Sequence, residues 1–252
     1  MPAGFNPALQ AGWSPVPARL PDRAPVMAVV VDTEEEFDWH KPFDRQSVGT
    51  RSIPAQDLAH AVFDRYGIAP TYVVDHAVAT SEPAARYLRR LVDAGRARFG
   101  THCHPWVTPP HTEKVTAVNS FHGNLPPELE AAKLEASTLA VAQAFGRAPQ
   151  VFKAGRYGVG PTTLQTIRQL GYRIDCSFVP DTTFEHVHGP SFVGTPHHPF
   201  FVDATRELLE IPLSVGYGGW AWRAGQRFPL MWDSPMLQRL RWPSVLSRSN
   251  AL

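Results

Sequence analysis

Residues 27–36 have the sequence MAVVVDTEEE, in which an unbroken apolar run is followed at once by a cluster of acids. Apolar runs of this length are typical of strands that are buried on both faces, as they are in parallel sheets. We therefore predict a buried strand over residues 27–31, with Asp32 and Glu34 just past its carboxyl end.

Farther along the chain, one pattern occurs repeatedly: apolar residues at helical spacing, then a glycine, then a short apolar strand. A glycine in this place suits the left-handed position at which many helices end. The predicted helices cover residues 58–66, 84–91, 129–145 and 164–170, and the strands after them lie near 71–74, 97–101, 151–152 and 174, with one more within 208–213. Strands that alternate with helices indicate a parallel sheet, either open and doubly wound or closed into a partial barrel.

Polar and titratable residues follow each of the predicted strands. They are Asp32 and Glu34, Asp75 and His76, His102 and His104, Lys153 and Arg156, and Asp175. In both parallel architectures the active site lies at the carboxyl ends of the strands. We therefore expect acids, imidazoles and cations to meet on one rim of the sheet.

The composition excludes several classes of protein. Lys and Arg number 24 and Asp and Glu 23, which gives a net charge of +1, whereas nucleic-acid and membrane-surface proteins show a basic excess. The two cysteines cannot form a disulfide scaffold, and no stretch approaches the roughly 20 apolar residues that span a membrane. We expect a cytoplasmic protein with a loose N-terminal arm over residues 1–26, a main domain over 27–215 and an aromatic-rich segment and tail over 216–252.

Asp32 and Glu34 lie two residues apart in an extended segment, so their side chains share a face. His102 and His104 have the same spacing, and a carboxylate with two histidines is a frequent ligand set of catalytic zinc. We predict that His102, His104 and a carboxylate of this acidic cluster bind one divalent ion, most simply Zn²⁺. The alternatives are a solvated acidic loop and a pair of histidines without a metal. Cys103 points to the opposite face and is expected to be buried.

A cation past a strand end can orient a catalytic carboxylate through a charge-assisted hydrogen bond. Lys153 and Arg156 are the candidates, and the alternative is a pair of surface cations beside a turn. Trp39, Trp106 and the aromatic residues of 217–232 can stack on sugar faces or pack in the core. We predict that Trp39, Trp106 and Tyr157 contact the substrate.

Four longer phrases carry a resemblance to a known family. They are VVVDTEEEFDW, THCHPWVTPP, NSFHGNLPPELEAAKLE and FKAGRYGVGPTTLQTIRQLGYRIDCS. In this order they resemble the polysaccharide deacetylases of the NodB-homology type, carbohydrate esterase family four. More narrowly, they look like a WalW-type subgroup associated with cell-wall or surface polysaccharide synthesis, over roughly residues 27–215.

The resemblance implies a distorted (β/α)7 barrel and a metal-dependent hydrolase that removes acetyl groups from N-acetyl sugars. Asp32 would be the catalytic base and Glu34 a metal ligand, although family members with two adjacent acids would instead suggest Glu34 as base and Glu35 as ligand. Lys153 occupies the place of the arginine that orients the base, with Arg156 close enough to replace it. Asp175 matches a late catalytic aspartate, and Trp106 stands where the family's second ligand histidine falls.

The late L-x-H motif of the family, whose histidine acts as general acid, does not follow residue 176. The candidates to replace it are His186, His188, His197 and His198. The resemblance also implies a barrel that is incomplete at the C-terminus, and an open sheet edge would favour a homo-oligomer, cover by residues 217–232, or low stability. Two other functions stay open: a hydrolase of a small non-sugar amide, and a domain that binds glycan without cleaving it.

Overall fold

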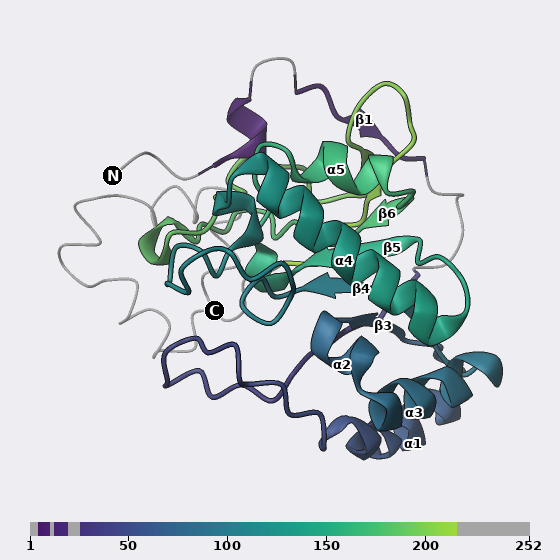
Figure 1. Ribbon diagram of the computed structural model, residues 1–252. Helices are drawn as coiled ribbons and strands as arrows, with labels where there is room; N and C mark the ends of the chain where they lie inside the picture. Colours follow the sequence, from purple (N-terminus) through teal and green to yellow (C-terminus); the bar gives the residue numbers. More distant parts are fainter. Residues whose placement is uncertain (1–4, 11–12, 20–25, 216–252) are drawn as a thin grey trace, which may run out of the picture.

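The computed structural model describes residues 5–10, 13–19 and 26–215 (Figure 1). The strands are β1 (Val16–Pro17), β2 (Val30–Thr33), β3 (Thr71–Val74), β4 (Arg98–Cys103), β5 (Val151–Ala154), β6 (Ile174–Asp175), β7 (Phe200–Phe201) and β8 (Leu209–Glu210). The α-helices are α1 (Asp57–Arg65), α2 (His76–Thr80), α3 (Glu82–Asp93), α4 (Pro127–Phe145) and α5 (Thr163–Gln169). Short 3-10 helices cover Pro7–Leu9, Ile53–Gln56, His122–Asn124, Gly155–Tyr157 and Glu185–Val187.

The strands form one sheet in the order β1-β7-β8-β6-β5-β4-β3-β2. From β2 to β6 and on to β8 all neighbours are parallel, and β7 is antiparallel to both β8 and β1. The predicted α/β class with a parallel sheet is therefore confirmed. Within the described part of the chain no ladder joins β1 to β2, and closure of the barrel stays a prediction.

The first predicted strand is displaced and less buried than expected. It covers Val30–Thr33 instead of residues 27–31, and Met27 is 70% exposed. The reason is its place in the sheet: β2 ends the strand order and pairs only with β3. An apolar run reports β propensity and hydrophobicity, but it does not distinguish a central strand from a terminal one.

The four predicted helices are present, and the glycine after each of them has a positive φ. The angles are 63° at Gly67, 70° at Gly95, 69° at Gly146 and 91° at Gly171. Helix α2 was not predicted, because five residues are too few to show a helical period. Its signal is the capping residue Asp75, whose Oδ1 accepts a hydrogen bond from the Val78 N–H at 2.8 Å.

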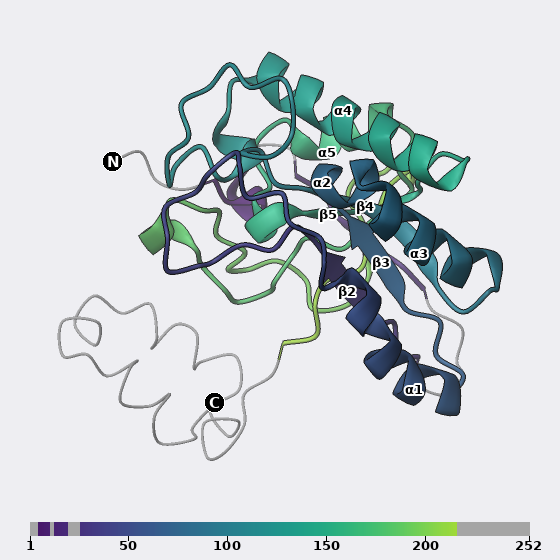
Figure 2. The ribbon, with the colours of Figure 1, turned by 60° about the horizontal axis from the view of Figure 1, so that its bottom comes forward.

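Helix α4 lies across the sheet over β4 and contacts α2, α3 and α5 (Figures 1 and 2). One apolar core lies between α2, α3, α4 and the strands β3 and β4, and there the rings of Phe99 and Phe145 stack at 4.3 Å between centroids. A second core surrounds β5, β6 and α5 and includes Phe152, Phe178 and Phe200. The two cores reach the last residues of their strands, Val74, Cys103 and Ala154, and the loops begin directly beyond them. Figure 1 shows these loops gathered at the end of the sheet toward which β4 points.

Two described pieces of the predicted N-terminal arm pack against the sheet. Strand β1 pairs with β7, the Ser191 N–H donates to the Phe5 carbonyl at 2.8 Å, and Trp13 meets Phe200 edge to face at 5.9 Å. These residues are therefore not loose, contrary to the expectation. The aromatic residues expected to cover a sheet edge, Tyr217, Trp220, Trp222, Phe228 and Trp232, lie outside the described residues.

Among the described helices, none combines the length and the apolar character needed to cross a membrane. Cys103 and Cys176 are buried free thiols. The predicted burial of Cys103 is confirmed, and burial raises the pKa of this thiol to about 12.

Candidate active site

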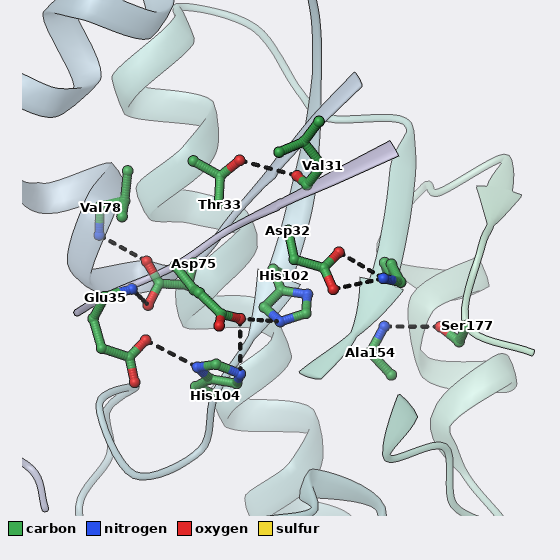
Figure 3. A network of polar contacts seen from close by, with 12 residues as sticks. Val31, Asp32, Thr33, Glu35, Asp75, Val78, His102, His104, Ala154 and Ser177 are labelled. Carbon is green, nitrogen blue, oxygen red and sulfur yellow. Dashed lines mark hydrogen bonds and ion pairs between the residues drawn. The ribbon is translucent and has the colours of Figure 1, made fainter. Parts of the chain in front are cut away.

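Glu34, His102 and His104 come together at the carboxyl ends of β2 and β4. The Oε2 atom of Glu34 lies 3.3 Å from Nε2 of His102 and 3.4 Å from Nε2 of His104. Both imidazoles are 1% exposed, whereas 28% of the Glu34 side chain is open to solvent. Figure 3 shows the two rings side by side below the strand that carries Asp32. The structure thus gathers the three predicted ligands in one place.

These residues fit a divalent metal ion. Their ligand atoms all lie within 4.8 Å of one another, and neither ring nitrogen of the buried His102 makes a well-formed hydrogen bond within the described residues, although Nε2 faces the Glu34 carboxylate at 3.3 Å. A buried imidazole without hydrogen bonds is costly unless something else engages its nitrogen. One oxygen and two nitrogen ligands leave a fourth tetrahedral position open, as in catalytic zinc sites. The metal itself stays a prediction.

Glu35 orients His104 from behind. Its Oε2 accepts a hydrogen bond from Nδ1 of His104 at 2.9 Å, so Nε2 keeps its lone pair on the side of Glu34. Burial lowers the pKa of His104, which favours the neutral imidazole that a metal requires. A carboxylate on the second nitrogen of a ligand histidine is the usual outer support of a metal site. Glu34 thus faces the Nε2 atoms of both imidazoles as a candidate ligand, whereas Glu35 contacts His104 from the Nδ1 side.

Asp75 supports Glu35 in turn. It is fully buried at the end of β3, and its Oδ2 lies 3.4 Å from the Glu35 backbone N–H (Figure 3). Burial, together with the neighbouring Glu35 carboxyl, raises the pKa of Asp75 well above its usual range. Burial also raises the pKa of Glu35, to about 6. The sequence placed Asp75 on the rim but did not reveal that it stands behind a ligand histidine.

Asp32 is held by Lys153. The Lys153 Nζ lies 2.6 Å from both carboxylate oxygens of Asp32, and the lysine side chain is only 7% exposed. Lys153 is next to His102 in the parallel register of β4 and β5, so its side chain extends over the same face. The carboxylate therefore lies beside the candidate metal ligands and is fixed by a charge-assisted pair.

Gly155 allows β4 and the segment after β5 to approach closely. A Cβ atom there would lie 2.1 Å from the Cys103 carbonyl oxygen and 2.5 Å from Cδ2 of His104. Any side chain at this position would thus collide with the backbone of β4 and with the His104 ring. The next two residues, Arg156 and Tyr157, take up left-handed backbone angles of φ 55° and φ 58°.

Arg156 has a different partner from the predicted one. Its Nη1 donates to Oγ of Ser120, and its guanidinium lies over the rings of Phe121 and Phe43. The Arg156 guanidinium is held by these loop residues and does not contact Asp32. Among the described residues, the hydrogen bonds to Asp32 therefore come from Lys153 alone.

The predicted substrate aromatics differ in exposure. Trp39 is 54% exposed, and its ring centroid lies 6.5 Å from that of His104. Trp106 is 1% exposed because it stacks on His104 at 4.2 Å and packs against Phe43. No face of Trp106 is free for a sugar, contrary to the prediction. Tyr157 is half-buried, with Lys153 Nζ 4.9 Å from its ring.

Asp175 does not take part in this cluster. It is fully buried, and its Oδ1 accepts a hydrogen bond from Oγ of Ser177 at 2.5 Å. Its carboxyl group also faces that of Glu210, the residue opposite it on β8. Two buried carboxyl groups can share a hydrogen bond only if one carries a proton. The structure thus gives Asp175 a place in the sheet instead of the predicted catalytic one.

The pair of Asp175 and Glu210 predicts a pH-dependent stability. Burial raises the pKa of both groups, so above about pH 4.5 the folded state keeps a proton that the unfolded chain releases. The free energy of unfolding should fall with rising pH in this window, by up to about 1.4 kcal/mol per pH unit. Glu210→Gln removes the titrating group and keeps an acceptor for the Phe178 N–H. We expect the variant to lose much of the difference in urea midpoint between pH 5 and pH 8. An unchanged difference, as expected for the exposed control Glu207→Gln, would contradict the shared proton.

None of the four histidines suggested as general acid contacts the cluster within the described residues. All four are exposed, and the contact recorded for His197 is with Asp181, at 2.8 Å between Nε2 and Oδ2. His186 lies in the 3-10 helix Glu185–Val187 and the other three lie in loops, all of them outside the strands. The proposal that one of them acts as acid therefore gains no support from the geometry.

Lys133 on α4 fixes the loop that follows His104. Its Nζ is buried and donates to the carbonyl oxygens of Pro105, Thr108 and Pro110 at 2.6–2.9 Å. It also lies 3.1 Å from Oε1 of Glu113. Periodicity assigned this position to the helix but could not show that a lysine would be buried there.

Lys133→Met should destabilise the protein by about 3–5 kcal/mol. The variant keeps the apolar stem but leaves buried carbonyl oxygens without a donor and the Glu113 carboxylate with Arg45 alone, 3.7 Å away, among the described residues. Chemical unfolding measures this loss, with Lys114→Met as the control because Lys114 is exposed in the same loop. A loss below about 1 kcal/mol would show that water replaces the ammonium group at no great cost.

Comparison with known proteins bears on the fold. No protein-family model matches the sequence, and no curated protein does either. Among solved structures, a protein assigned as a polysaccharide deacetylase from Mycobacterium smegmatis aligns with a TM-score of 0.51 and 16% identity. The alignment covers 83% of this chain and 64% of the other. The chain has the polysaccharide deacetylase fold.

Two further structures align less closely. The deacetylase PplD of Streptococcus pyogenes gives a TM-score of 0.45 and 13% identity, over 77% of this chain and 67% of the other. Puue allantoinase gives a TM-score of 0.47 and 13% identity, over 75% of this chain and 61% of the other. The alignment with the Mycobacterium smegmatis structure confirms the expected likeness to polysaccharide deacetylases for the fold, and the WalW-type subgroup stays a prediction.

Proposed function

We propose that this protein is a metal-dependent hydrolase that removes acetyl groups from an N-acetylated saccharide of the cell wall or cell surface. The observation that carries the proposal is the convergence of Glu34, His102 and His104 beside a lysine-held carboxylate, Asp32. A fold shared with polysaccharide deacetylases is consistent with it, although a fold alone does not determine chemistry.

Glu34, His102 and His104 would hold the ion, and zinc suits a set of two nitrogens and one oxygen. When bound, the ion would supply Lewis-acid polarisation of the acetyl carbonyl and lower the pKa of a water molecule. Asp32 would accept the proton of the attacking water at a carboxylate oxygen. Lys153 keeps this carboxylate oriented, with its Nζ 2.6 Å from both carboxylate oxygens.

Trp39 provides the proposed platform for the sugar. It is the exposed aromatic residue beside the cluster, and its ring lies edge-on to that of His104. Sugar rings present apolar C–H faces that pack on exposed indoles. A sugar stacked on Trp39 would therefore have its acetamido group close to His104.

The test is metal analysis combined with acetate release. The protein, stripped with chelator and reloaded with Zn²⁺, should bind one ion per chain and release acetate from N-acetylated oligosaccharides. Chelation should abolish the release, and Zn²⁺ should restore it. Release from small non-sugar acetamides but from no saccharide would favour the amide-hydrolase alternative, and metal binding without any release would favour a glycan-binding role.

A further inference from the structure

Arg156 is a cation at the active-site rim that the proposed chemistry leaves unused. Its guanidinium is half-buried and lies 4.0 Å from the ring centroid of Phe121, 5.0 Å from that of Phe43 and 5.9 Å from that of Trp39. These rings belong to the loops after β2 and β4, so the side chain is enclosed by two different loops. Cation–π contacts explain how the group is held, but they do not neutralise its charge.

No carboxylate pairs with Arg156 in the described part of the chain. Among the described residues its one hydrogen bond is the donation from Nη1 to Oγ of Ser120, and this hydroxyl in turn donates to the Ala117 carbonyl. A guanidinium has five N–H donors, and none of its nitrogens is both buried and without a partner. The N–H groups of Arg156 that are not bonded to Ser120 therefore face solvent at the rim. Burial alone lowers the pKa of Arg156, to about 10, so the group stays charged at neutral pH.

The charges around the site bear on whether Arg156 can bind an anionic group of the substrate. Asp32 and Glu34 are acidic and partly open to solvent, and Lys153 is already paired with Asp32. In the proposed zinc-loaded site Lys153 offsets the charge of Asp32 and the ion would offset that of Glu34, so Arg156 is left, among the described residues, as the cation at the rim that can attract an anionic substituent. Trp39 lies beside both His104 and Arg156, so a sugar stacked there would have one substituent near the candidate metal site and another near the guanidinium.

We propose that the saccharide deacetylated at this site is acidic, and that Arg156 binds its carboxylate or phosphate group. This inference rests on the proposed deacetylase function and names the class of its substrate. The planar fork of arginine binds both oxyanions through paired N–H···O bonds, which a lysine cannot reproduce. Arg156 thus selects the substrate, whereas Asp32 and the candidate metal ligands carry the chemistry.

The test compares oligosaccharides of equal length: one of N-acetylhexosamine alone, one in which it alternates with a uronic acid, and one joined by phosphodiesters. The zinc-loaded wild type should have the highest kcat/KM on one of the acidic substrates, and the better of the two distinguishes carboxylate from phosphate. Arg156→Gln should lower kcat/KM on that substrate roughly 10- to 100-fold, mainly through KM, and leave the neutral substrate within about twofold. Arg156→Lys should recover only part of the preference.

Arg147→Gln is the matched control, because its guanidinium lies over the ring of Phe99, 5.1 Å from the centroid, at the amino end of β4. It should leave the preference for acidic substrates unchanged. Equal loss on neutral and acidic substrates in Arg156→Gln, or no acidic preference in the wild type, would overturn the inference. If Arg156→Gln does not fold, the partial loss of preference in Arg156→Lys carries the test.

Binding of the same oligosaccharides by calorimetry separates this inference from the proposed function. Acetate release from the neutral substrate only, without charge-selective binding, would leave the deacetylase function in place and remove the role of Arg156. Charge-selective binding that Arg156→Gln abolishes, without acetate release from any substrate, would refute the deacetylase function and retain Arg156 as the anion-binding residue of a saccharide site.

Discussion

Glu34→Gln is expected to lose tight zinc binding and to lower acetate release by a factor on the order of 10³ or more. The substitution keeps the size of the side chain but removes the charge of the oxygen that faces both His102 and His104. Without it, two imidazoles must hold the ion alone, and the chemistry that depends on a polarised carbonyl and an acidified water is lost. Zinc titration by calorimetry and acetate release measure the two effects.

Glu35→Gln is the informative comparison, because the two glutamates are adjacent in sequence. Glu35 contacts Nδ1 of His104, so its amide variant should keep all three ligands and weaken zinc affinity by roughly 10- to 100-fold. Glu82→Gln, on the exposed face of α3, should change neither property. If Glu35→Gln lost the metal and Glu34→Gln kept it, the ligand and supporting positions would be reversed.

This comparison also shows where the sequence stops being informative. The period of two in an extended segment correctly placed Asp32 and Glu34 on one face and His102 and His104 on another strand end. It could not choose between Glu34 and Glu35, because both acids reach the same imidazole from opposite sides. That choice depends on how far β2 lies from β4, which is a property of the packed sheet.

The fold was predictable to the extent that its signals are local. Helices that end at glycine and lead into apolar strands depend on nearest neighbours in sequence, and these elements are present. The exposure of β2, the burial of Lys133 and the partner of Arg156 depend on contacts between residues far apart in the chain. The resemblance to polysaccharide deacetylases did not predict these contacts, because it compares residue types along the sequence and not the residues packed around them.

At Asp175 the sequence predicted a catalytic role that the contacts of the side chain do not support. A matching aspartate after a strand suggested catalysis, but the side chain points to Ser177 and Glu210 and away from the cluster. Strand ends supply the rim residues, and the register determines which face of the sheet each of them uses. In the register of β5 and β6, Asp175 is opposite Phe152, a core residue, whereas His102 is opposite Lys153 in that of β4 and β5.

Asp32→Asn is expected to lower kcat by about 10²-fold or more while zinc still binds one ion per chain. An amide cannot accept a proton at neutral pH, and general-base catalysis contributes roughly 10²- to 10⁴-fold. The variant keeps an oxygen for the Lys153 ammonium group, so the buried lysine retains a hydrogen bond and the fold should survive. Unchanged turnover, or loss of the metal together with the rate, would remove Asp32 from the role of base.

Lys153→Met completes a cycle that tests whether the two residues act as a unit. On its own it should lower kcat, because the carboxylate loses the group that orients it at 2.6 Å. In the double variant the loss should be no larger than in Asp32→Asn alone, since a positioning residue has nothing left to position. Thermal unfolding of all three variants separates this effect from destabilisation. Multiplicative losses in kcat would instead mean that Lys153 contacts the reacting groups directly, independently of Asp32.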